Sequence, residues 1–304
     1  MAKRTRAKGY AEWQPRAHTR ALIASVNEIL MEYREHLPLT IRQVFYRLVG
    51  VYGYPKDENA YERLGNALNR ARRAGYIAFD HLRDDGISVM SHDHYAGVED
   101  FYGYLNHLGT RYERDKLADQ AVDMRVLCEA AGMMPQLSRV CRRYSVPVYS
   151  CSGFDSLTAK HELAKACAQT YDWRDRPTVI LHLGDLDPSG VSIYESMRED
   201  VLAFVASDVP RLDADEVAMF DRIALTRGQV EHYDLTTYAP KASDLRSRRW
   251  VGETCQLEAL PPDTLAGLLA SAIEAELDQE TLARARDAEA RERRQISRAL
   301  PSAD

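Results

Sequence analysis

The stretch Thr178-Val-Ile-Leu-His-Leu183, followed by Gly184-Asp-Leu-Asp-Pro-Ser-Gly-Val191, places two carboxylates directly after an apolar run. A short apolar run that ends in turn residues indicates a buried strand. Asp185 and Asp187 are two positions apart, so on an extended chain their side chains point the same way. Pro188 and Gly190 end the strand, and we expect a helix from Ser189 onward.

Two carboxylates this close together repel each other unless a cation lies between them. Mg²⁺ suits such a site, because it prefers hard oxygen ligands and usually needs only one or two protein carboxylates together with water and phosphate oxygens. The alternative is a pair of solvated turn aspartates that cap the helix.

Short apolar runs and helical stretches alternate around this strand. The expected strands are Arg125–Cys128, Val146–Tyr149, Thr178–Leu183 and Arg222–Leu225. Alternation of this kind predicts an α/β fold with a mostly parallel sheet flanked by helices. Glu129 directly follows the first of these strands. We therefore expect Glu129 and the two aspartates at the carboxyl edge of the sheet, where sites form in such folds.

The order and strand positions of these three carboxylates resemble the Toprim domain of topoisomerases, primases and related nucleases. The resemblance covers roughly residues 121 to 232. In that family the three carboxylates hold Mg²⁺ and act on phosphodiester bonds, so the resemblance implies a magnesium site at Glu129, Asp185 and Asp187. Ala130 stands where many relatives have a lysine.

Composition indicates a globular protein with room for two domains. The chain has 304 residues, of which 45% are apolar and 28% are charged. No apolar run approaches the length of a membrane span, and the N-terminus lacks a secretory core, so we expect a cytoplasmic protein with no membrane association. The five cysteines form no Cys-x-x-Cys pair and are expected to be reduced core residues.

Charge is distributed unevenly along the chain. Residues 1–83 carry fifteen lysines or arginines and eight aspartates or glutamates, which gives them a net charge of +7. Because the net charge of the whole chain is −6, the remaining residues have a net charge of −13. A basic N-terminal part joined to an acidic part suggests that the first binds a phosphate backbone while the second holds cations. The alternative is a solvated surface with uneven charges.

The basic part contains two helices before residue 54. The first extends from His18 to Arg34, and Thr40 with Gln43 predicts a capping box at the start of the second. Helical periodicity places Tyr46 near the polar face, beside Arg42. Tyr46 is a candidate nucleophile, and the alternative is an ordinary surface tyrosine.

A third helix, Glu58 to Arg73, has a polar face that suits a DNA groove. Asparagine and arginine pair bidentately with base edges and phosphates, and the residues on this face are Asn66, Asn69, Arg70 and Arg73. Residues 75–79 and 87–89, joined by Asp84-Asp-Gly86, predict the hairpin of a winged helix-turn-helix. The alternative is a plain helical bundle.

The segment Thr40-Ile-Arg-Gln-Val-Phe-Tyr46-Arg47 resembles the active-site segment of the topoisomerase VI A subunit and the related meiotic double-strand-break protein. The resemblance spans about residues 18–260, and short phage and mobile-element relatives are closest in size. It implies that Tyr46 forms a phosphotyrosyl bond to DNA, for which Arg42 or Arg47 could contribute positive charge. It also implies a homodimer that cuts both strands of duplex DNA, with tyrosine and metal from different subunits. Phe45 replaces the first of the family's two adjacent tyrosines.

These interpretations give a map of the chain and a function. We expect a basic arm at 1–17, a winged-helix DNA-binding domain at 18–90, a helical linker at 91–120, a Toprim domain at 121–260, and a C-terminal helix with a charged tail at 261–304. No Gly-x-x-x-x-Gly-Lys phosphate loop is present, so strand passage would need a separate ATPase subunit. The leading function is Mg²⁺-dependent double-strand cleavage by tyrosine transesterification. The alternatives are a Toprim nuclease that uses metal-activated water and a non-catalytic DNA-binding protein.

Three further features have weaker signals. His182 alternates with leucines in the buried strand and is interpreted as a satisfied core histidine. Glu258 follows a short apolar run and is a further candidate for the metal shell. A cluster of basic residues after the sheet either contacts DNA or solvates a loop; it consists of Lys241, Arg246, Arg248 and Arg249.

Overall fold

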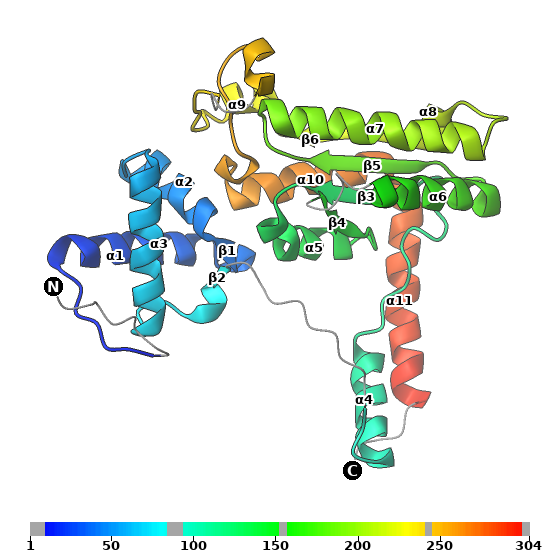
Figure 1. Ribbon diagram of the computed structural model, residues 1–304. Helices are drawn as coiled ribbons and strands as arrows, with labels where there is room; N and C mark the ends of the chain where they lie inside the picture. The colour runs from blue at the N-terminus through cyan, green and yellow to red at the C-terminus, as the bar shows by residue number, and fades with distance from the viewer. Residues whose placement is uncertain (1–9, 84–93, 152–156, 241–244, 300–304) are drawn as a thin grey trace.

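The computed structural model describes residues 10–83, 94–151, 157–240 and 245–299, which form an N-terminal helical lobe, a sheet lobe and a projecting helix pair (Figure 1). The main helices of the N-terminal lobe are α1 (Ala17–Glu32), α2 (Ile41–Tyr52) and α3 (Glu58–Arg73). Two short strands, β1 (Leu39–Thr40) and β2 (Leu82–Arg83), pair in parallel beside them. The three predicted helices are therefore confirmed.

The start of α2 follows the predicted capping box. The Thr40 hydroxyl accepts a hydrogen bond from the Gln43 amide (3.0 Å), and the Gln43 side chain accepts one from the Thr40 amide (2.9 Å). This reciprocal pairing satisfies two of the free N–H groups at the helix start. The capping box also fixes the residue at which α2 begins, and therefore the positions of Arg42 and Tyr46 on the helix.

The predicted wing hairpin is wrong in its first arm. Residues 75–79 form a turn that leads into the 3₁₀ helix η2 (Phe79–His81), and β2 pairs in parallel with β1. The amides of Gly75 and Tyr76 donate to Arg72 and Ala71 carbonyls, with Gly75 at a φ of 77°, so they close α3 in a Schellman motif. Those N–H groups are consequently unavailable to a strand. The second predicted arm and its turn, residues 84–89, lie outside the described residues.

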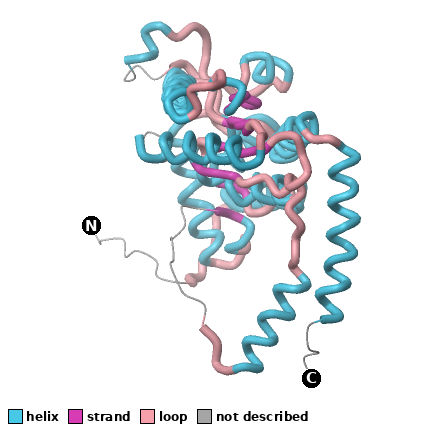
Figure 2. The backbone as a smooth tube through the Cα atoms, turned by 90° about the vertical axis from the view of Figure 1, so that its right-hand side faces the viewer, coloured by secondary structure: helices cyan, strands magenta, loops and turns pink. Residues whose placement is uncertain are grey.

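The sheet lobe contains the four parallel strands that the sequence predicted (Figure 2). Their order across the sheet is β4 (Val148–Ser150), β3 (Asp123–Cys128), β5 (Thr178–Leu183) and β6 (Ala218–Ala224). β3 and β5 pair over their full length, with Cys128 opposite Leu183. All residues of β5 are buried, as expected for a central strand covered on both faces.

Helices cover both faces of this sheet (Figure 1). One face packs against α5 (Met134–Arg142) and α10 (Pro262–Glu276), and the other against α6 (Leu157–Arg174) and α7 (Pro188–Asp208). Successive strand residues alternate between the two cores, with Leu127 and Ile180 on the α6–α7 side. Helix α10 lies beyond the expected domain end at residue 260 and packs against α5 and β6.

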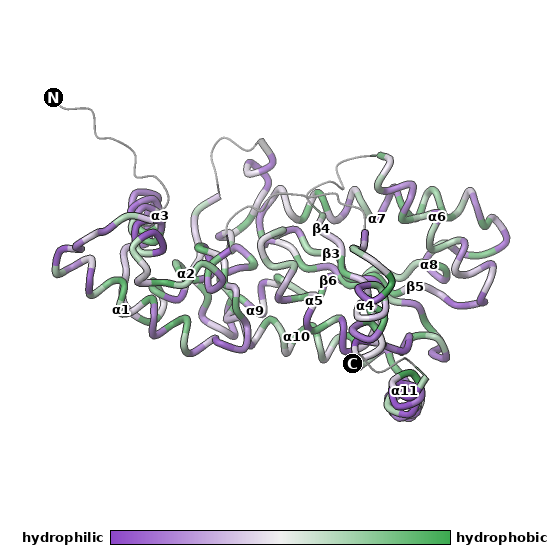
Figure 3. The backbone as a smooth tube through the Cα atoms, turned by 90° about the horizontal axis from the view of Figure 1, so that it is seen from below, coloured by the Kyte–Doolittle hydropathy of each residue, from purple (hydrophilic) through white to green (hydrophobic). Residues whose placement is uncertain are grey.

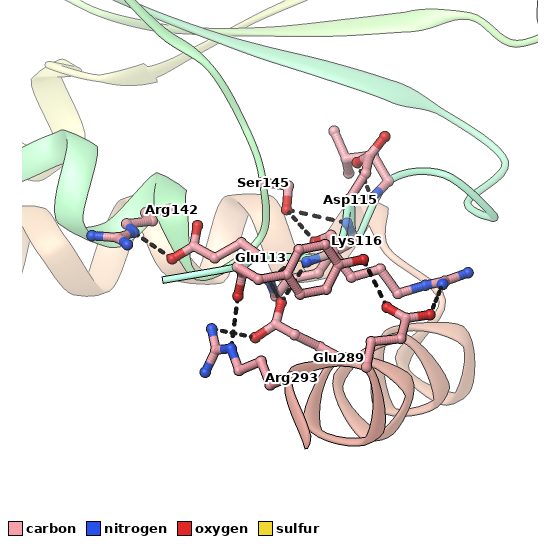
Figure 4. Close-up of polar contacts among 11 residues, drawn as sticks. Glu113, Asp115, Lys116, Arg142, Ser145, Glu289 and Arg293 are labelled. Carbon is pink, nitrogen blue, oxygen red and sulfur yellow. Dashed lines mark hydrogen bonds and ion pairs between the residues drawn. The ribbon is translucent and has the colours of Figure 1, made fainter. Parts of the chain in front are cut away.

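The helices α4 (Val98–Thr110) and α11 (Gln279–Ala299) project together from the sheet lobe (Figures 1 and 2). Figure 3 shows that α11 is mainly hydrophilic. The middle of α11 is held by a buried ion pair between Lys116 and Glu289 (2.5 Å), and Arg293 also contacts Glu289 (Figure 4). None of the helices in the described ranges combines the length and apolarity needed to cross a membrane.

Truncation of Leu269 tests whether α10 belongs to the sheet core. Leu269 is fully buried, so we expect Leu269→Ala to lower the free energy of unfolding by about 2–5 kcal/mol in urea titrations. Leu157 is 64% exposed, and the control Leu157→Ala should change it by less than about 0.5 kcal/mol. Equal effects of the two changes would contradict this packing.

Candidate active site

Two carboxylates of the predicted site lie together in one cavity. Glu129 and Asp185 line a cavity of 540 Å³ at the carboxyl edge of the sheet, between the two lobes. The same cavity contains polar side chains from the N-terminal lobe and from the end of the sheet lobe, namely Thr40, Arg42, Arg83 and Glu258. The sheet lobe thus contributes carboxylates to this cavity, and the N-terminal lobe contributes arginines.

Strand register brings Glu129 and Asp185 together. Each follows a neighbouring strand, and the Glu129 amide continues the ladder by donating to the Leu183 carbonyl (2.9 Å). The Asp185 amide then donates to Glu129 Oε2 (3.1 Å). Residues 56 positions apart in sequence therefore meet because both strands end at the same edge.

Two glycines allow this close approach. A Cβ atom at Gly184 would lie 2.7 Å from Glu129 Oε2, and one at Gly190 would lie 2.9 Å from the same atom. Both distances are shorter than a methyl group tolerates next to a carboxylate oxygen. The glycines at each end of the Asp-Leu-Asp turn therefore make room for the Glu129 side chain.

The Glu129 carboxyl is desolvated and lies near two other carboxylates. Burial raises the pKa of Glu129 from 4.5 to about 7, and the Asp185 and Asp187 carboxylates add to this rise. Burial also raises the pKa of Asp185. Arg222 opposes the rise at Glu129 only in part, because its guanidinium donates to the Gly184 and Asp185 carbonyls. A site with this charge favours a cation.

Asp187 has a different position. Its Oδ1 accepts a hydrogen bond from the Gly190 amide (2.7 Å) and caps α7. Helix capping is the role that the sequence offered as the alternative to metal binding. Asp187 lines a second cavity, which contains Tyr46, whereas Asp185 lines the first. Across the described ranges, no group of three or more His, Cys, Asp or Glu side chains is arranged to hold a metal ion.

Consecutive residues 255–258 connect the acidic pair to the N-terminal lobe. The Leu257 amide donates to Asp185 Oδ1 (2.8 Å), and the neighbouring Gln256 Oε1 accepts from the Tyr46 hydroxyl (2.7 Å). Glu258 is buried and accepts hydrogen bonds from Arg42 and Thr40, both at 3.4 Å. Sequence reasoning missed Gln256, because its role depends on a contact 210 positions away.

The expected exposure of Tyr46 is wrong. Tyr46 is 5% exposed, because η6 (Leu257–Ala259) packs on the side of α2 that the periodicity assigned to solvent. Burial and the neighbouring Tyr238 raise the pKa of the Tyr46 phenol well above its usual value. Arg42 opposes this rise.

The polar face of α3 has the predicted exposure at three positions. Asn66, Asn69 and Arg70 are exposed, whereas Arg73 is half-buried. The Arg70 guanidinium lies 5.9 Å from the centre of the Trp13 ring. In the basic cluster after the sheet, Arg246 donates to the Ser189 hydroxyl (3.3 Å) beside the second cavity, and Lys241 lies outside the described residues.

His182 is buried as expected, but it is not satisfied. Its Nδ1 has no hydrogen-bond partner within the described ranges. Burial and the Arg222 guanidinium lower its pKa to about 3, so the ring is neutral. The ring packs against Tyr194 at 4.8 Å between centroids.

Comparison with family models, curated proteins and solved structures gives no match. The resemblance to the Toprim domain therefore stays a prediction from the sequence.

The raised pKa of Glu129 predicts a pH dependence of stability in chelator. The folded state binds the Glu129 proton more tightly than the unfolded state, so the Glu129 contribution to the free energy of unfolding falls as pH rises from 4.5 to about 7. Glu129→Gln removes this contribution. Urea titrations from pH 5 to 8 should therefore show the variant gaining stability relative to wild type with rising pH.

Glu162 lies on the exposed face of α6, and Glu162→Gln is the matched control, for which we expect curves parallel to wild type. Parallel curves for Glu129→Gln would show that folding does not raise the pKa of Glu129.

Proposed function

We propose that this protein is a Mg²⁺-dependent enzyme that cleaves duplex DNA, with a winged-helix-like lobe that binds DNA and a Toprim-like lobe that holds the metal. The observation that carries the proposal is the contact between Glu129 and Asp185 in a cavity that also contains Arg42 and Arg83. Acidic and basic groups that converge in this way suit a phosphodiester together with a cation.

The residues present fit Mg²⁺. Glu129 and Asp185 provide hard oxygen ligands, and one or two carboxylates suffice when water and phosphate complete the shell. Burial and the neighbouring carboxylates raise the pKa of Glu129, so a cation in the cavity would favour its ionised form. Asp187 would join from the neighbouring cavity. When bound, Mg²⁺ would supply positive charge beside the phosphate and the leaving oxygen.

Tyr46 is the proposed nucleophile. Its oxygen would form a bond to phosphorus as the bond from phosphorus to the 3′ oxygen breaks, giving a 5′-phosphotyrosyl product and a free 3′ hydroxyl. The proton that the phenol loses balances the one that the 3′ oxygen gains. Arg42 would favour the ionised phenol, because it already opposes the rise in the Tyr46 pKa.

A specific observation favours hydrolysis by water as the second candidate. The Tyr46 hydroxyl is buried and donates to Gln256, and the pKa of its phenol is raised, so the side chain is not activated in this arrangement. A Toprim nuclease would use the same acidic pair without Tyr46. A non-catalytic DNA-binding protein is the remaining outcome.

The proposed assembly follows from the same resemblance. We propose a homodimer on duplex DNA, in the cytoplasm, with strand passage requiring a separate ATPase subunit. All five cysteines are free and buried, in keeping with a reducing compartment.

Cleavage of supercoiled plasmid separates these candidates. With Mg²⁺ and a detergent quench, we expect wild type to leave protein attached to 5′ ends, and chelator to abolish cutting. Tyr46→Phe should abolish attachment. Asp185→Asn retains an acceptor for the Leu257 amide while removing the charge, so it should reduce cutting at least about 100-fold with the fold intact.

Cutting by Tyr46→Phe without attachment would support hydrolysis instead. DNA binding without cutting by wild type would support the non-catalytic alternative. Thermal unfolding of each variant establishes that it is folded.

Arg70 tests the DNA-binding face of α3. Arg70 is exposed, so Arg70→Ala should leave the fold intact and weaken binding to duplex DNA. If Arg70 contacts a phosphate, the slope of log affinity against log salt should fall by about 1. Arg284, exposed on α11, provides the control Arg284→Ala, and equal salt slopes for the two variants would argue against this face.

A further inference from the structure

The second cavity, beside Tyr46, has an aromatic wall. It encloses 540 Å³ between the two lobes and is lined mostly by apolar atoms. Its aromatic residues come from α2, α3 and the segment before η5 (Leu245–Arg249), namely Phe45, Tyr46, Tyr61 and Tyr238. Ligand cavities in proteins usually enclose about 300–1,000 Å³, so this one has room for a nucleobase and its sugar.

The rings pack edge to face, and cations lie over two of them. Phe45 meets Tyr61 at 5.3 Å and 84°, and Tyr46 meets Tyr238 at 6.2 Å and 70°. The Lys56 ammonium lies 4.8 Å from the centre of the Tyr238 ring, and the Arg42 guanidinium 5.9 Å from that of Tyr61. Aromatic rings interleaved with cations are the means by which proteins bind single-stranded nucleic acid.

Carboxylates line this cavity together with the cations Arg42 and Lys56. Asp57 and Asp187 also line it, and each accepts a hydrogen bond from its own helix start, at 2.8 Å from the Ala60 amide and 2.7 Å from the Gly190 amide. Glu58 is a third carboxylate. The charges on its rim are therefore mixed in sign, whereas its wall offers ring faces and edges on which a base can pack.

The two cavities share a wall. Arg42 and Tyr61 line both the acidic cavity and the aromatic one. A DNA strand with its phosphate beside Glu129 and Asp185 would therefore bring an adjacent nucleotide to the aromatic cavity. A base that is paired within a duplex cannot enter such a cavity, because its partner strand and stacked neighbours hold it.

We propose that the aromatic cavity binds one unpaired nucleobase next to the phosphate that is cut. The preferred substrate is then duplex DNA with one unpaired nucleotide next to the cleavage position. This inference depends on the proposed function for the location of the phosphate. Tyr238 and Tyr61 stack on the base, and Lys56, which is exposed, moves from the Tyr238 ring to the sugar-phosphate backbone.

Binding in chelator tests this without cleavage. The full chain is titrated with a paired duplex and with the same duplex carrying one unpaired 2-aminopurine. We expect the duplex with the unpaired 2-aminopurine to bind about tenfold more tightly, which is the gain in affinity expected from stacking one base on an aromatic side chain. We also expect its 2-aminopurine fluorescence to change on binding. In Tyr238→Leu the ratio of the two affinities should fall to about one.

Tyr149 is 37% exposed on β4 and lines neither cavity, so Tyr149→Leu should retain the tenfold ratio. Lys56→Ala provides a second variant at an exposed position, and in this variant the ratio of the two affinities should fall about threefold. Equal affinity of wild type for both duplexes would overturn the proposal, as would a ratio unchanged in both Tyr238→Leu and Lys56→Ala.

The two proposals fail in different ways. If the cleavage proposal is wrong, the unpaired duplex still binds more tightly in chelator. If the cavity proposal is wrong, Mg²⁺-dependent cutting and 5′ attachment persist on fully paired plasmid without any preference in binding.

Discussion

The contact between Glu129 and Asp185 is the constraint on which the site depends. It follows from the register of β3 and β5, which ends both strands at the same edge of the sheet. Two half-buried carboxylates that line one cavity raise the free energy of the fold unless a proton or a cation compensates them. Without a cation the compensation is a proton on Glu129, whose pKa rises to about 7. Gly184 and Gly190 leave the space that this contact requires.

The second constraint is the link between the lobes. Residues 256, 257 and 258 contact Tyr46, Asp185 and Arg42 respectively, so one short segment positions the candidate nucleophile, a candidate metal ligand and a cation. These contacts couple the position of the N-terminal lobe to that of Asp185. If tyrosine and metal act between subunits, as the resemblance implies, the hydrogen bond from Tyr46 to Gln256 must first break.

Features governed by local rules were predictable from the sequence. The capping box at Thr40, the bounds of α3 and the four parallel strands all depend on residues a few positions apart. The burial of Tyr46, its bond to Gln256 and the unpaired nitrogen of His182 depend on packing between distant segments. Periodicity assigns one face of α2 to solvent, and it contains no information that η6 covers that face. The packing of α10 against α5 and β6 was not predictable for the same reason, because it depends on contacts between segments that are distant in the sequence.

Calorimetric titration with Mg²⁺ at pH 8, in the absence of DNA, tests the central claim most directly. The account predicts one ion per chain, with binding lost in both Glu129→Gln and Asp185→Asn, and weaker binding in Asp187→Asn. Binding of Mg²⁺ that is unchanged in Glu129→Gln and Asp185→Asn, or no binding by the wild-type chain, would contradict it.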